Sequence, residues 1–119
     1  MRRIFPIALF VLIFGLAGVT EAPAELIREL RLEAGGEEGG GIWNPLVLEA
    51  VKGETIRITL VNPTEVMHGF NIKKFKIREQ IFGESERVIT FKAKKSGTFK
   101  FFCHFHKKHQ PGKLIVINE

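Results

Sequence analysis

The chain has 119 residues, a formal net charge of +5 and a single cysteine. This length fits one domain, and one cysteine excludes an internal disulfide. The aromatic residues are mostly phenylalanines in alternating patterns, which suit a core better than a platform for stacked bases. We therefore expect no nucleic acid among the partners.

Residues 1–24 have the features of an export signal. Arg2 and Arg3 precede an almost wholly apolar run at 4–19, and small residues at 22–24 offer a cleavage site. The run is about 16 residues long, short of the roughly 20 that a membrane span needs. We expect a signal helix that is cleaved on export to the periplasm or another extracytoplasmic space, the alternative being a retained membrane anchor. Residues 25–119 then form the mature domain.

From residue 25 onward, short apolar runs alternate with turn residues, a pattern typical of an all-β sandwich or barrel. The inward face of one run is expected to carry Ile56, Ile58 and Leu60, and that of the first run Leu26 and Leu32. Strands are predicted at 26–33, 42–51, 55–61, 69–75, 87–92, 98–103 and 113–117.

Two segments are predicted to lie outside the packed sheets. The glycine-rich stretch 35–41 is expected to form a flexible loop, because glycine disfavours regular strands. Residues 76–83 show no clear alternation and are expected to be irregular.

Charge is unevenly distributed along the chain. Residues 25–65 are rich in glutamate, whereas lysine and arginine dominate the part that follows. A basic face suits an acidic partner protein or an anionic membrane surface, the alternative being a merely solvated surface.

A thiol and several imidazoles lie between the last two predicted strands. Cys103, His106 and His109 follow one another at three-residue steps, so that a thiol at a strand end and imidazoles on the next turn can reach one ion. His68 follows a strand-breaking proline, in a loop able to supply the remaining ligand. Thiolate and imidazole suit copper or zinc. Structural zinc sites usually show paired cysteines, which are missing here, so one copper ion is favoured.

Two residues beside these candidate ligands, Gln110 and His104, are expected to have different roles. Gln110 is a rival to His109 as the fourth ligand, since an amide oxygen can bind a metal axially. His104 directly follows the thiol and should point to the opposite face of the strand, away from the ion.

At these residues the sequence resembles the cupredoxin family, with the best agreement over residues 51–117. The resemblance implies a Greek-key β-sandwich that binds one copper ion through His68, Cys103, His106 and a fourth ligand. It is carried by Met67-His68-Gly69-Phe70, by Gly97-Thr98-Phe99 leading to Cys103, by His106, and by Gly112-Lys113-Leu114-Ile115-Val116.

The sequence departs from the blue members of that family at position 109. A methionine is usual there as a weak axial ligand, whereas this chain has His109. Histidine is a stronger donor and favours a tetragonal site that is red or green rather than blue. The chain also resembles nitrosocyanin-like members more than plastocyanin-like ones, in the Asn-x-x-x-x-x-x-Gly-Phe-x-Ile stretch at 62–72 and the Cys-x-x-His…His-x-Pro-Gly-x-Leu ending at 103–114. The nitrosocyanin-like glutamate ligand is replaced by His68.

These features predict an exported one-electron carrier rather than an enzyme. The resemblance implies that His106 passes the electron to a redox partner, and the basic face suits an acidic one. Neither a nucleophile elbow nor a phosphate-binding loop appears in the sequence. The alternatives are a nitrosocyanin-like copper enzyme or nitric oxide binding protein, and a periplasmic copper delivery protein.

Overall fold

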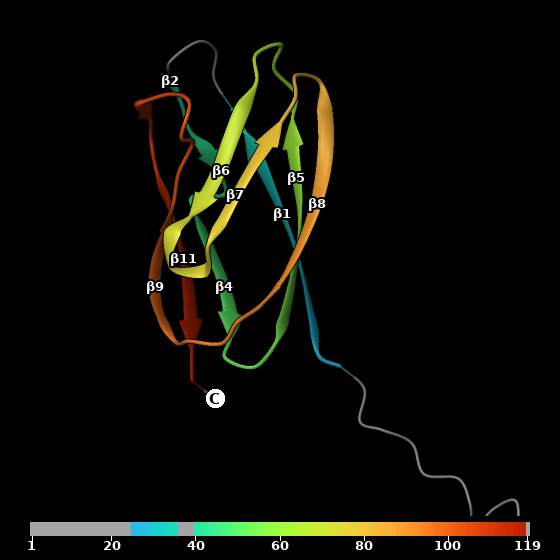
Figure 1. Ribbon diagram of the computed structural model, residues 1–119, viewed down its shortest axis with the longest axis vertical. Helices are drawn as coiled ribbons and strands as arrows, with labels where there is room; N and C mark the ends of the chain where they lie inside the picture. Colours follow the sequence, from blue (N-terminus) through green and yellow to red (C-terminus); the bar gives the residue numbers. More distant parts are fainter. Residues whose placement is uncertain (1–24, 36–39, 119) are drawn as a thin grey trace, which may run out of the picture.

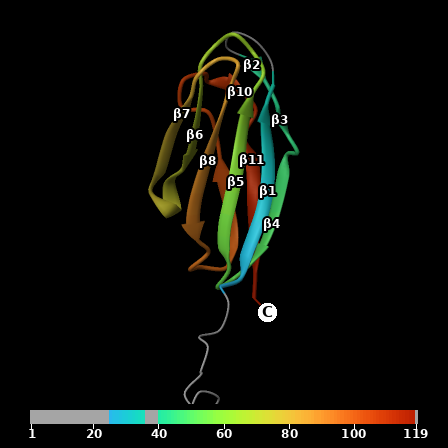
Figure 2. The same ribbon diagram turned by 90° about the vertical axis from the view of Figure 1, so that its right-hand side faces the viewer.

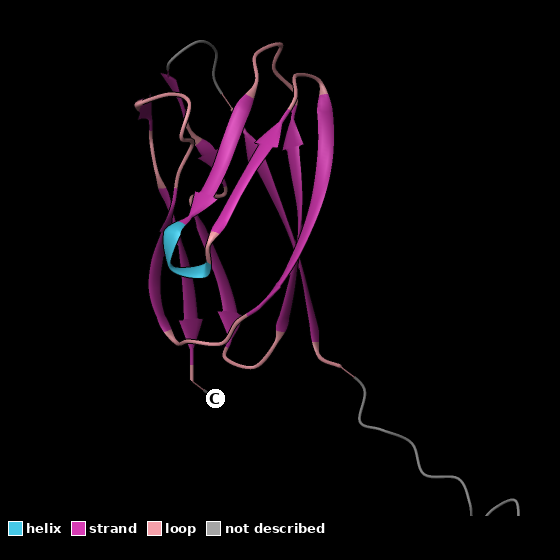
Figure 3. Cartoon of the chain, in the orientation of Figure 1, coloured by secondary structure: helices cyan, strands magenta, loops and turns pink. Residues whose placement is uncertain are grey.

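The computed structural model describes residues 25–35 and 40–118, so the predicted signal helix at 1–24 lies outside the described residues. Strands make up most of the described chain, with one short 3-10 helix, η1 (Lys73–Phe75) (Figure 3). No helix in these two ranges has the length and hydropathy that a membrane crossing requires. The strands are β1 (Ile27–Ala34), β2 (Gly40–Gly41), β3 (Trp43–Asn44), β4 (Val47–Val51), β5 (Thr55–Asn62), β6 (His68–Ile72), β7 (Ile77–Ile81), β8 (Ser85–Lys92), β9 (Gly97–Phe101), β10 (Lys108–His109) and β11 (Gly112–Ile117).

The strands form two layers (Figures 1 and 2). One layer has the order β3-β1-β5-β8, with β1 and β5 parallel. The other has the order β4-β11-β9 and continues into the β6–β7 hairpin, because the backbones of Asn71 and Phe102 exchange hydrogen bonds of 2.9 and 3.1 Å. The predicted all-β sandwich is confirmed.

Two expectations about loops are wrong. Residues 77–81 form β7, which pairs antiparallel with β6; its outer residues face solvent on this hairpin, so hydrophobic alternation is weak. Gly40 and Gly41 form β2, which pairs in parallel with Lys108 and His109 of β10. Backbone hydrogen bonds alone hold glycines in such a ladder, and composition does not reveal them. The predicted strand at 69–75 ends at Ile72, where η1 begins.

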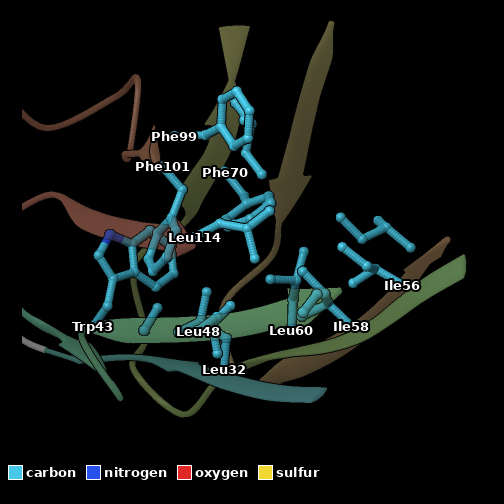
Figure 4. Packing of buried hydrophobic residues seen from close by; sticks show 14 of the residues in the cluster. Leu32, Trp43, Leu48, Ile56, Ile58, Leu60, Phe70, Phe99, Phe101 and Leu114 are labelled. Carbon is cyan, nitrogen blue, oxygen red and sulfur yellow. The ribbon is translucent and has the colours of Figure 1, made fainter. Parts of the chain in front are cut away.

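The core fills the space between the layers (Figure 4). Ile56, Ile58 and Leu60 are fully buried, as predicted from their alternation. Leu26 was predicted to face inward but is 69% exposed, because β1 begins only after it. Large aromatic and aliphatic side chains from both layers meet in this core: Leu32, Trp43, Phe70, Phe101 and Leu114.

The sandwich has two distinct ends, which β5 connects. At the basal end, Thr55 begins β5 and its N–H donates to Leu26 at 2.8 Å, where the described chain begins. At the distal end, Asn62 ends β5 and leads into the loop before β6. A strand of 8 residues spans about 27 Å, so side chains at the two ends act independently.

One glycine sets the packing at the distal end. A Cβ on Gly69 of β6 would lie only 2.5 Å from Cε1 of His104, which follows β9. The imidazole therefore lies directly against the β6 backbone. Only glycine leaves that space free, which explains the residue type at this position.

We predict that Gly69→Ala destabilises the protein by about 1–3 kcal/mol, because overpacking forces the imidazole or the strand to move. Denaturant unfolding of the metal-free protein measures the effect. The double variant Gly69→Ala/His104→Ala should unfold close to His104→Ala alone, since the clash is gone. An unchanged midpoint for Gly69→Ala would show that the contact is not restrictive.

Candidate metal centre

Three metal-binding side chains converge at the distal end. Donor atoms of His68, Cys103 and His106 all lie within 4.8 Å of one another. The Cys103 Sγ is 3.4 Å from Nδ1 of His106 and 3.9 Å from Nδ1 of His68. These are three of the four residues predicted as ligands, brought together from segments 35 positions apart in the sequence.

The fold delivers each donor from a different local structure. His68 is the first residue of β6 and is fully buried. Cys103 follows the end of β9, and the bridge between Asn71 and Phe102 ties that end to β6. His106 lies in the loop between β9 and β10 and is only half-buried. His68 and Cys103 are therefore held in place by strands, whereas His106 faces the surface.

Asn62 organises the loop that leads to His68. It is fully buried, and its Nδ2 donates to the carbonyls of Val66 at 2.7 Å and Ile81 at 3.0 Å. Its Oδ1 accepts from the N–H of Thr64 at 3.0 Å and from its hydroxyl at 2.6 Å. Sequence reasoning treated this position as a simple chain break. An asparagine directly before a proline at a strand end was the available signal.

The sulfur of Cys103 is buried and accepts a hydrogen bond. Its side chain is 4% exposed, and the backbone N–H of Gly69 donates to Sγ at 3.2 Å. This N–H is aimed at the sulfur that would bind a metal ion as thiolate. Burial also protects this free cysteine from other chains.

The spacing of the donors fits one metal ion. Metal–sulfur and metal–nitrogen bonds of about 2.3 and 2.0–2.1 Å at tetrahedral or trigonal angles place sulfur and nitrogen roughly 3.6–3.8 Å apart. The observed separations of 3.4 and 3.9 Å bracket that value. A thiolate with two imidazoles is also the donor set of copper electron-transfer sites.

His109 lies beside this group without joining it. Its ring centroid is 5.1 Å from that of His68 and 4.7 Å from that of Trp43, and its Nδ1 is 3.3 Å from the Gln110 carbonyl. Burial lowers the pKa of His109 from its ordinary value of 6.5, and the charge of His106 lowers it further. The hydrogen bond to the Gln110 carbonyl acts in the opposite direction and raises this pKa. The ring is thus kept in the neutral form that metals require. Its role as fourth ligand stays a prediction.

The two remaining candidates lie farther out. Gln110 is exposed, and its N–H donates to the carbonyl of Gly41 at 2.9 Å. His104 packs against Gly69 and is not part of the donor group. Burial and the charge of Arg78 lower the pKa of His104.

A surface pocket of about 290 Å³ opens over the donor group. Cys103 and His106 lie in its wall, whereas His68 does not. The ammonium groups of Lys73 and Lys100 lie 5.7 and 5.2 Å from the centre of the Phe102 ring. The full lining comprises Lys100, Phe102, Cys103, His104, His106, Lys107, His109 and Pro111.

Several solved structures share this fold. Auracyanin A, a blue copper protein from Chloroflexus aurantiacus, has a TM-score of 0.62 and 17% identity, over 76% of this chain and 98% of its own. The metal-binding domain of a Cu(I)-exporting P-type ATPase from Streptococcus pneumoniae, solved with Cu(I), has a TM-score of 0.59 and 25% identity, over 84% and 99%.

Larger copper proteins contain a similar unit. The copper nitrite reductase of Nitrosomonas europaea has a TM-score of 0.65 and 17% identity over 78% of this chain. This chain spans 42% of that reductase and 39% of a multicopper oxidase. Comparison with curated proteins gives no match. The family model of the cupredoxin-like domain matches residues 6–116, and the chain therefore belongs to the cupredoxin-like family.

Proposed function

We propose that this protein is an exported one-electron carrier that holds a single copper ion with His68, Cys103 and His106. The observation that carries the proposal is the convergence of one buried thiol and two imidazoles at one end of a β-sandwich. When bound, copper would supply the Cu(II)/Cu(I) couple. The likeness to auracyanin A, a blue copper protein, supports this assignment.

The three donor residues have different roles in electron transfer. His68 and Cys103 are buried on or next to strands, so their positions change little with the oxidation state. His106 is the most exposed of the three donors and lies in the pocket wall, where it connects the site to the surface. We propose that the electron leaves the protein through the imidazole of His106.

The rim of this pocket suits an acidic redox partner. Lys100 and Lys107 line it, and Phe102 offers an aromatic surface between the ammonium groups of Lys73 and Lys100. Opposite charges around an exposed donor speed the encounter of two proteins and orient them. Docking at this rim would place the partner next to His106.

Copper delivery is the second candidate function. The metal-binding domain that resembles this chain over 84% of its length belongs to a Cu(I)-exporting ATPase. A pocket lined by Cys103 and His106 would let an acceptor thiol approach the ion through the half-buried His106. Copper transfer to a metal-free acceptor at a rate faster than spontaneous release would favour this function.

The same pocket also leaves room for a small ligand such as nitric oxide. Optical and spin-resonance spectra of the copper protein that change on adding nitric oxide would favour this alternative, and unchanged spectra would remove it. Export rests on the N-terminal sequence, and we propose a periplasmic or other extracytoplasmic location for the mature domain.

We propose His109 as the fourth ligand, supplied by rotation of its buried ring toward the ion. His109→Ala should then change the optical spectrum of the copper protein strongly and raise its reduction potential, because a good donor to Cu(II) is lost. Gln110→Ala is the matched control and should leave both unchanged. If Gln110→Ala changes the spectrum and the potential while His109→Ala leaves both unchanged, the fourth ligand is Gln110.

Voltammetry of the copper protein tests the carrier function. A reversible one-electron wave is expected, because the donors are held in place in both oxidation states. Lys100→Gln/Lys107→Gln should slow exchange with an acidic redox protein more than with a small neutral mediator, since only the protein docks at this rim. An irreversible wave, with release of copper on reduction, would contradict an electron carrier and favour delivery.

A further inference from the structure

A second pocket, the basal lysine pocket, lies away from the donor group. Its volume is about 300 Å³, and two half-buried rings, Phe75 and Phe91, lie 5.3 Å apart in its wall. Five exposed lysines complete its lining: Lys74, Lys76, Lys92, Lys94 and Lys95. No residue of the metal centre takes part in it.

None of the lysines of this pocket forms an ion pair with a carboxylate of the described residues. No acidic side chain lines the pocket. Within residues 25–35 and 40–118, every ion pair is made by an arginine, and none involves a lysine. Several like charges around one hollow repel one another, and a polyanionic surface placed against them relieves that repulsion.

The lower wall of the pocket belongs to the basal end of the sandwich. Ala93, between two of the lysines, exchanges backbone contacts with the β4–β5 turn: its N–H donates to the Glu54 carbonyl at 2.8 Å, and its own carbonyl accepts from Gly53 at 2.9 Å. The backbone N–H of Thr55, which follows Glu54, donates a hydrogen bond to the Leu26 carbonyl. The lysines therefore lie close to the point where the described chain begins.

This end also exposes apolar side chains. Leu26 is 69% exposed, Ile27 42% and Ile117 54%, and Ile117 is joined to the same turn through its bond with Lys52. Two acidic groups nearby are engaged, since Glu54 pairs with Arg28 at 2.9 Å and Glu25 bonds to the Thr55 hydroxyl. Lysines mixed with exposed apolar residues are typical of surfaces that rest on a lipid headgroup layer.

We propose that the basal lysine pocket and the apolar residues around it bind an anionic phospholipid membrane surface. An acidic protein would explain the lysines, but it would not explain the exposed apolar side chains of Leu26, Ile27 and Ile117 at the same end. In a chain that retains the apolar run at 4–19 as an anchor, the five residues between that run and Glu25 form a tether of at most about 20 Å.

Binding at this end leaves the metal centre free. The length of β5, about 27 Å, separates the basal lysines Lys92, Lys94 and Lys95 from the donor group and exceeds the Debye length of about 8 Å at physiological salt. The upper wall of the pocket, at Lys74, is next in sequence to Lys73 at the Phe102 ring, so the membrane would have to contact the lower wall for an acidic partner to dock at His106. The protein would stand on the membrane with its metal centre turned outward.

Lysine labelling of the full chain tests this orientation. The protein is mixed with vesicles of phosphatidylcholine alone or with added phosphatidylglycerol, treated with an acetylating reagent, and analysed by peptide mass spectrometry. We expect the phosphatidylglycerol vesicles to protect all five pocket lysines, with loss of that protection at high salt. Lys107 and Lys108, at the distal end, serve as internal reporters and should stay reactive.

Two charge-matched variants make the test specific. Lys92→Gln/Lys94→Gln/Lys95→Gln should lose the protection of Lys74 and Lys76, whereas Lys100→Gln/Lys107→Gln/Lys108→Gln should keep it. Equal labelling with both kinds of vesicle would overturn the proposal, as would protection of Lys107 and Lys108 instead. Protection by inorganic pyrophosphate alone, without any effect of vesicles, would assign the pocket to a soluble anion and would also overturn it.

Discussion

The backbone bridge between Asn71 and Phe102 is the constraint on which the metal centre depends. It ties β6, which begins with His68, to the end of β9, which is followed by Cys103. Strands joined in this way cannot slide without breaking buried hydrogen bonds. The same connection lets the Gly69 N–H reach the sulfur. A buried thiolate needs such partners, because an uncompensated charge in a protein interior is costly.

A second set of contacts fixes the other side of the centre. The two-residue strand β2 pairs with β10, and the Gly41 carbonyl accepts from Gln110, so the loop that carries His109 is held against the sandwich. Trp43 packs edge-on against Phe70 and Phe101 and also contacts the His109 ring. The backbone around the donors is therefore held in place on the buried side, and the pocket lined by Cys103 and His106 opens on the other.

Much of this arrangement could be predicted from the sequence, and the failures have physical reasons. The alternation of Ile56, Ile58 and Leu60 follows directly from burial of one face of a strand. Cys103 and His106 are close in sequence, so their convergence needs only one turn. The pairing of Gly40 and Gly41 with β10 depends on backbone hydrogen bonds, which side-chain patterns do not encode. Asn62 before Pro63 is a signal in the sequence, but the carbonyls that its side chain reaches depend on the fold of the loop. The contact of His109 with Gln110 depends on the orientation of one ring, which spacing does not determine.

The account as a whole rests on one thiolate and two imidazoles sharing a single copper ion. X-ray absorption at the copper edge measures this directly, because sulfur and imidazole nitrogen scatter differently and at different distances. We predict one sulfur neighbour and at least two imidazole nitrogens in both oxidation states. A spectrum with only nitrogen and oxygen neighbours would contradict the account, because copper would then be bound without Cys103.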